Sequence, residues 1–154
     1  NSLKGGISYL DEKLNLVIHG GVDDVWFDLD NKKLIVVDYK AQSTNYPVST
    51  QSYLNSEWHL NYKLQMDIYV HILRKMNFIV SDMSYFYVCN CEKTNNQFEN
   101  KMEFKTTLVP YNTNTSWIEG KLKEMKEVLN LESPPSVEPT CEKCAYLKGG
   151  KDFF

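Results

Sequence analysis

The chain has 154 residues, of which 42% are hydrophobic and 24% are charged. This composition suits one globular domain and excludes collagen-like, coiled-coil and disordered chains. Lys and Arg number 17 against 20 Asp and Glu, which argues against a protein that coats nucleic acid through an excess of basic charge. The apolar runs are too short to span a bilayer, and the first residues lack the apolar stretch of a secretory signal. We therefore expect no association with a membrane.

Residues 7–40 are expected to be extended. Residues 14–19 alternate in the manner of a strand. Gly20 and Gly21 then interrupt the pattern, and glycine inside a strand indicates a bulge or a close approach to the backbone. Residues 28–33 supply a turn. Residues 34–40 begin with four apolar residues in a row, which is typical of a strand covered on both faces.

A loop, a long helix, two strands and a last helix are expected next. Residues 41–57 are polar and contain a proline, so we interpret them as a loop. Residues 57–76 predict a helix, and residues 83–91 and 102–109 predict strands, the second with one face largely solvated. The last helix is expected near residues 116–129. The apolar stripe expected to anchor the long helix recurs every four residues and consists of Leu60, Leu64, Ile68 and Ile72.

This order of elements predicts an α/β domain with a mixed central β-sheet flanked by helices. Residues 133–140 hold three of the five prolines and indicate an extended tether to a Cys-x-x-Cys tail. We therefore expect one domain over residues 1–132 and a tail over residues 133–154 that packs on the same domain.

The candidate chemistry lies at the end of the second predicted strand. Asp38 and Lys40 are two apart, so they share one face of a buried strand. Burying a carboxylate and an ammonium costs several kcal/mol unless they are paired or bind something. Asp23 lies on the preceding strand, where a hairpin could bring it beside Asp38. Asp24 competes with Asp23, because a shift of one residue at the Gly20–Gly21 bulge would exchange their faces.

Two carboxylates at one point repel each other, and a hard divalent cation relieves that repulsion. A neighbouring Lys could orient a water molecule or stabilise charge on a phosphate. The alternative interpretation is a structural ion pair between Asp38 and Lys40, with Asp23 as a turn residue. The order of Gly-x-Asp, a turn, and an apolar strand ending in Asp-x-Lys favours the functional interpretation.

These motifs resemble a known family. Gly21-Val22-Asp23 and Val36-Val37-Asp38-Tyr39-Lys40 look like the core of the PD-(D/E)XK nuclease superfamily, whose fold is restriction-endonuclease-like. The sequence is most similar to the RecB-like branch, which includes CRISPR-associated exonucleases and carries a helix with Gln-x-x-x-Tyr. Gln65 and Tyr69 match that third motif in the expected order.

The resemblance implies roles for the matching residues. Asp23 and Asp38 would bind Mg²⁺ or Mn²⁺, with the main-chain carbonyl of Tyr39 as a further ligand. Lys40 would position or activate the attacking water. Gln65 and Tyr69 would support the site and contact the substrate, although a polar edge beside the helix stripe is their simpler interpretation.

The four cysteines form two close pairs. Cys141 and Cys144 have the spacing of a metal knuckle, and Cys89 and Cys91 share a strand face. A zinc or iron–sulfur site is one possibility, and free thiols with a tail that packs on the domain are the other. The pattern, without a secretory signal, does not indicate a disulfide framework, so a cytoplasmic location is expected.

The sequence therefore predicts a metal-dependent nuclease that hydrolyses phosphodiester bonds, with nucleic acid as its partner and DNA favoured over RNA. One alternative is a catalytically inert nuclease fold that only binds nucleic acid. The other is a structural metal protein organised by its cysteines.

Overall fold

The computed structural model describes residues 5–93 and 102–150. The chain divides into two compact units, Asn1–Glu119 and Gly120–Phe154. Within the described ranges, none of the helices combines the length and the hydrophobicity that crossing a bilayer requires.

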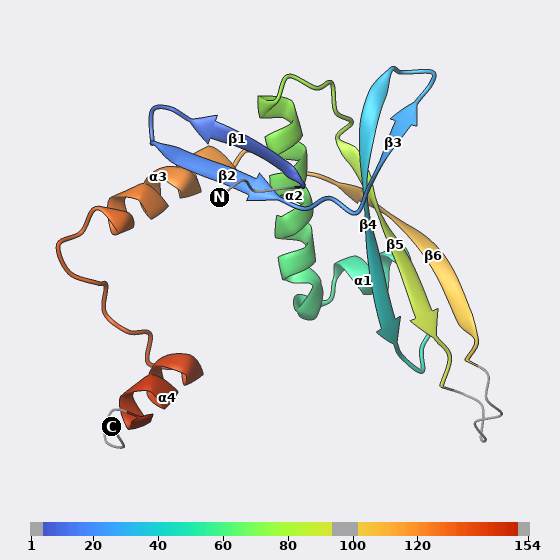
Figure 1. Ribbon diagram of the computed structural model, residues 1–154. Coiled ribbons are helices and arrows are strands. Elements are labelled where there is room, and N and C mark those ends of the chain that lie inside the picture. Colours follow the sequence, from blue (N-terminus) through green and yellow to red (C-terminus); the bar gives the residue numbers. More distant parts are fainter. Residues whose placement is uncertain (1–4, 94–101, 151–154) are drawn as a thin grey trace. The chain divides into compact units, whose positions relative to one another are not determined.

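A four-stranded mixed sheet forms the centre of the first unit (Figure 1). Its strand order is β3-β4-β5-β6, and the pairing is antiparallel except between β4 and β5, which are parallel. Parallel neighbours need a long crossover, and the helical segment between β4 and β5 supplies it. This arrangement confirms the predicted α/β fold with a mixed central sheet. The strands are β3 (Asp24–Asp28), β4 (Lys33–Ser43), β5 (Met83–Cys91) and β6 (Phe104–Asn112).

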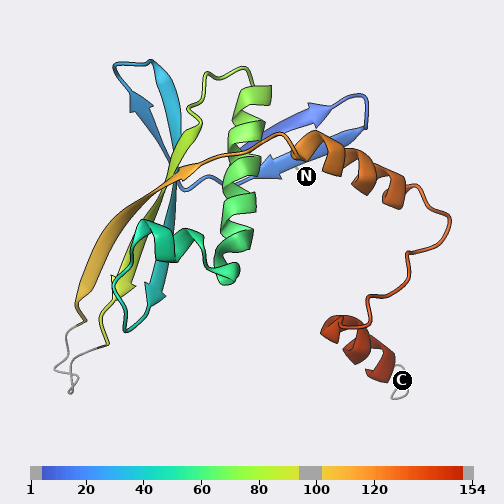
Figure 2. The same ribbon diagram turned by 180° about the vertical axis from the view of Figure 1, so that it is seen from behind.

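The first strands of the chain form a separate antiparallel hairpin. It consists of β1 (Ile7–Asp11) and β2 (Leu16–Gly20), and it lies beside the long helix α2 (Leu60–Lys75) in both ribbon views (Figures 1 and 2). The close approach predicted at the glycine pair occurs at Gly20. A Cβ atom built there would lie 2.6 Å from Cε1 of Tyr69, so only glycine fits against this ring without displacement.

The segment interpreted as a loop contains a short helix. β4 runs on to Ser43, and α1 covers Thr50–Leu54. Ser49 and Ser52 form a reciprocal capping box that satisfies main-chain N–H groups at the start of α1. The prediction of a loop over residues 41–57 was therefore wrong for residues 41–43, which continue β4, and for residues 50–54, which form α1.

The long helix is present, but its core stripe differs from the predicted one. A 3₁₀ turn, η1 (Glu57–His59), leads into α2 (Leu60–Lys75). Leu60 is 52% exposed, and Ile72 is the only fully buried member of the predicted stripe within this described helix. The physical reason is that α2 has partners on more than one side, the sheet and the β1–β2 hairpin, so apolar residues occur around much of its circumference. The residues of α2 in the main core are Met66, Tyr69, Val70 and Leu73.

The two faces of the sheet differ in burial. Val36, Phe86, Val88 and Val109 lie in the core with α2, whereas Leu108, next to Val109 on β6, is 43% exposed. One face of the last strand is largely solvated, but it is the face of Phe104 and Leu108, whereas the alternation in the sequence predicts Val109 on the solvated side. That prediction of the buried face was therefore wrong.

The second unit contains most of α3 (Ile118–Leu129) and all of α4 (Glu142–Gly150). Residues 130–141 between the two helices contain no helix or strand. The packing of this tail on the domain stays a prediction.

Candidate active site

Asp38 and Lys40 lie on the inner face of β4, as the strand pattern predicted. Asp38 is 2% exposed, and its Oδ2 atom lies 2.6 Å from Nζ of Lys40. That oxygen is buried and accepts no hydrogen bond of ordinary geometry within the described structure. Burying a carboxylate is costly unless its oxygens are used. The Lys40 ammonium offsets part of that cost, and a carboxylate has about four lone-pair sites, so a further ligand can still bind.

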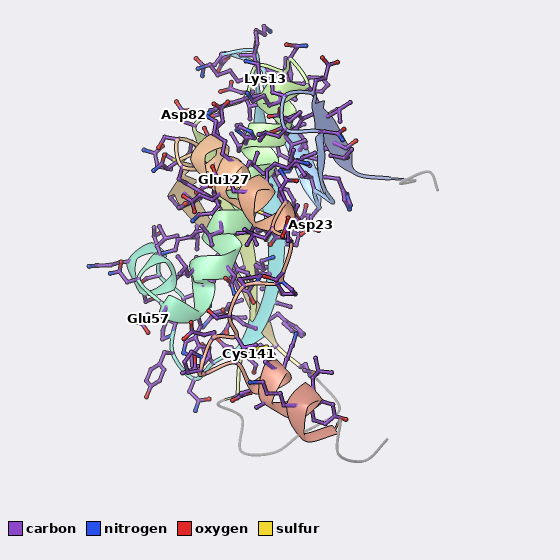
Figure 3. The ribbon with its side chains drawn as sticks, turned by 90° about the vertical axis from the view of Figure 1, so that its left-hand side faces the viewer. Lys13, Asp23, Glu57, Asp82, Glu127 and Cys141 are labelled. Carbon is purple, nitrogen blue, oxygen red and sulfur yellow. A yellow bond between two sulfur atoms is a disulfide. The ribbon has the colours of Figure 1, made fainter. Side chains whose placement is uncertain are left out.

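Asp23 directly precedes β3, and Figure 3 labels it. Its Oδ2 atom accepts a hydrogen bond of 2.9 Å from the main-chain N–H of Tyr39, which fixes the carboxylate against β4. Burial raises the pKa of Asp38, the Lys40 ammonium opposes that rise, and the neighbouring Asp23 carboxyl adds to it. The two carboxyl groups are thus close enough to interact, and a cation between them would relieve the repulsion.

The Asp24 carboxylate is already hydrogen-bonded to two side chains on the other face of the sheet. Its carboxylate accepts hydrogen bonds from the Tyr39 hydroxyl at 2.7 Å and from Trp26 Nε1 at 3.0 Å. Both bonds lower the pKa of Asp24, and the bond from Tyr39 has the larger effect. The geometry therefore favours Asp23 over Asp24 as the partner of Asp38.

Lys40 connects β4 to α2. Its Nζ atom donates to Oε1 of Gln65 at 3.2 Å, and the Gln65 amide in turn donates to the Tyr69 hydroxyl. Gln65 and Tyr69 are i and i+4 on α2, so their side chains lie next to each other on one face of the helix. The structure thus joins Asp38, Lys40, Gln65 and Tyr69 in one continuous network.

Sequence reasoning missed Tyr62, which contacts Lys40, and two further aromatic residues that pack behind it. The ammonium of Lys40 lies 4.5 Å from the centre of the Tyr62 ring, a cation–π contact that holds the lysine in place. His59 stacks on Tyr62 with ring centres 5.4 Å apart and lies 4.0 Å from the ring of Tyr53. The spacing of Tyr62 three residues before Gln65 could have indicated a shared helix face.

The residues present suit a hard divalent cation. Mg²⁺ and Mn²⁺ prefer carboxylate, carbonyl and water oxygens, and Asp23 and Asp38 provide two neighbouring carboxylates. Among residues 5–93 and 102–150, no group of three or more His, Cys, Asp and Glu side chains is arranged to hold a metal ion. Any ion here would therefore complete its coordination with main-chain, water or substrate oxygens.

The cysteines lie in separate parts of the chain. Cys89 and Cys91 are free thiols on β5 in the first unit, while Cys141 and Cys144 form a disulfide in the second. Thiolate ligands must be reduced and deprotonated. A zinc or iron–sulfur site at these residues stays a prediction for the reduced protein.

Comparison with known proteins gives one finding. A family model described as the PD-(D/E)XK nuclease superfamily matches residues 3–148. Neither the curated proteins nor the solved structures contain a significant match to the chain.

Proposed function

Because the chain belongs to the PD-(D/E)XK nuclease superfamily, we propose that it is a divalent-metal-dependent nuclease that hydrolyses phosphodiester bonds in DNA. The observation that carries the proposal is the cluster around Asp38. A buried carboxylate paired with a lysine, a second carboxylate beside it, and a glutamine that holds the lysine occur together. A structural ion pair alone would not need the second carboxylate.

Asp23, Asp38 and the Tyr39 carbonyl would hold Mg²⁺ or Mn²⁺. The ion supplies Lewis acidity and lowers the pKa of bound water. Asp38 and Asp23 must be ionised to bind it, and the hydrogen bond from the Tyr39 N–H already fixes Asp23.

Lys40 would orient the attacking water and stabilise negative charge on the phosphate. A lysine ammonium has three N–H donors. Asp38 and Gln65 engage two of them, which leaves the third for water or a phosphate oxygen. The Tyr62 ring restricts the side chain further, so the donor is preorganised before substrate binds.

Gln65 would act as a positioning residue for Lys40, with Tyr69 holding Gln65 in turn. This linkage supports placement in the RecB-like branch, where the corresponding helix motif accompanies the catalytic strand. A cytoplasmic location is part of the same proposal.

The test is cleavage of linear and circular DNA, and of RNA of the same sequence, with Mg²⁺, Mn²⁺ or EDTA. We expect divalent-dependent cleavage of DNA that is lost in Asp38→Asn and strongly reduced in Lys40→Ala. Lys33→Ala, at the exposed start of the same strand, is the matched control and should retain activity. Equal cleavage by wild type and Asp38→Asn would mean a contaminant or another site.

The same samples separate the alternatives. An inert nuclease fold would bind DNA without divalent-dependent cleavage. A cysteine-organised metal protein would retain its metal in Asp38→Asn and lose it when Cys141 and Cys144 are replaced by serine.

A further inference from the structure

A groove lies beside the cluster and is not used by the mechanism above. It has a volume of about 400 Å³ and is bordered by residues from the end of β4 through η1. Trp58 and Tyr46 line it and are 89% and 80% exposed. Figure 3 labels Glu57, the residue directly before Trp58. Two large aromatic rings that expose most of their surface at one groove need an explanation, because exposed apolar surface of this kind marks binding sites.

The groove adjoins the proposed catalytic residues. Gln42 lines it and lies two residues after Lys40 on β4, so both side chains share a strand face. His59 also lines the groove and stacks on Tyr62, the ring that contacts the Lys40 ammonium. A ligand in the groove would therefore reach the site where the phosphodiester is cleaved.

The side chains that line the groove favour contact with the rings of nucleic-acid bases over contact with phosphates. None of the described residues that line the groove is Lys, Arg, Asp or Glu, and the chain as a whole has a net charge of -3. Binding dominated by phosphate contacts would need basic side chains. Aromatic side chains instead bind bases by stacking, whatever the sequence.

We propose that this groove is a stacking subsite for unpaired bases of single-stranded DNA, next to the catalytic cluster. The faces of bases inside a duplex are covered by their neighbours, whereas an unpaired base can lie against Trp58 or Tyr46. The inference rests on the proposed nuclease function for its choice of nucleic acid over a peptide. The assignment concerns this groove alone and makes Trp58 and Tyr46 substrate-binding residues.

The test is binding by the full chain in EDTA, where cleavage cannot interfere. The probes are a fluorescein-labelled 12-nucleotide oligothymidine, a duplex of equal length, and a 12-unit abasic oligomer with the same phosphates but no bases. The variants are Trp58→Ala, Trp58→Phe and Tyr46→Ala. Tyr146→Ala is the matched control, because Tyr146 is 81% exposed and does not line the groove.

We expect Trp58→Ala to raise the Kd for oligothymidine by about fivefold or more, the lower end of one base–aromatic stack. Trp58→Phe keeps a ring and should retain most of the affinity. Tyr46→Ala should weaken binding in the same direction, and Tyr146→Ala should leave it unchanged. The abasic oligomer should bind wild type and Trp58→Ala equally.

Three results would overturn the subsite. The first is that Trp58→Ala and Tyr46→Ala bind oligothymidine as tightly as the wild type, and the second is that Trp58→Ala weakens binding of the abasic oligomer as much as binding of oligothymidine. The third is that the wild type does not bind oligothymidine, which would leave a peptide as the better occupant. If wild type cleaves DNA while these variants bind normally, the subsite fails and the nuclease function stands. If wild type binds through Trp58 without cleaving DNA under any divalent ion, the subsite stands and the nuclease function fails.

Discussion

Replacing Gly20 by alanine should damage the fold and the site together. The added Cβ would lie 2.6 Å from Cε1 and 2.9 Å from Cδ1 of Tyr69, well inside ordinary van der Waals contact. Tyr69 is only 6% exposed and belongs to the core, so its ring cannot simply swing into solvent. Overpacking of this kind costs about 1–3 kcal/mol.

That cost should lower Tm by about 4–12 °C for a cooperative unit of this size, measured by circular dichroism. Gly21→Ala is the matched control, because a Cβ at Gly21 meets nothing within 4 Å, and it should stay within about 0.5 kcal/mol of wild type. Because Tyr69 holds Gln65, Gly20→Ala should also lose more cleavage activity than Gly21→Ala at a temperature where both are folded.

A double-mutant cycle identifies the clash itself. In a Tyr69→Ala background the ring is gone, so adding Gly20→Ala should cost little further stability. Equal Tm values for wild type and Gly20→Ala would refute the reasoning. So would an undiminished loss in the Tyr69→Ala background, since the destabilisation would then come from somewhere other than this contact.

Three further predictions concern the acidic and helical residues. Asp23→Asn should abolish divalent-dependent cleavage and the rise in Tm on adding Mn²⁺, whereas Asp24→Asn should retain both; the reverse pattern would exchange their assignments. In metal-free buffer at pH 7, Asp38→Asn should be as stable as wild type or more so, because burial raises the pKa of Asp38 above its ordinary value of 3.8 and its ionised form then destabilises the fold. That advantage should disappear as the pH falls through the raised pKa towards the ordinary value, and an Asp38→Asn variant less stable than wild type at pH 7 would contradict the sign. Gln65→Ala should lower the free energy of unfolding by only about 0.5–1.5 kcal/mol, so the protein stays folded, while kcat falls clearly. Tyr69→Phe should reduce cleavage less than Gln65→Ala. Unchanged cleavage in both variants would mean that these residues serve packing only.

The short helix α1 shows what local pattern reading leaves out. Five residues are too few for a periodic apolar stripe, so residues 50–54 resembled the polar loop around them. The sequence signal was the pair Ser49 and Ser52, which form the capping box. Such pairs also occur in turns, and the burial of Tyr53 beside Phe86 gives this helix a packing partner.

The stripe of α2 was assigned to the wrong face for a related reason. A regular spacing of apolar residues identifies one helix face only when a single partner covers the helix. Here Tyr69 lies in the main core and also against Gly20 of the hairpin. Residues that looked like an anchor, such as Leu60, are half exposed instead.

The sequence alone determined the strands, the long helix and the shared face of Asp38 and Lys40, because the strand pleat is a local property of the backbone. It also placed Gln65 and Tyr69 together, because i and i+4 neighbours are fixed within one helix. Only the tertiary structure decided that Asp23 lies by Asp38 and that Gln65 bonds Lys40 across 25 positions. These contacts depend on the backbone path at Gly20–Gly21 and on how α2 packs against the sheet, which many distant residues set together.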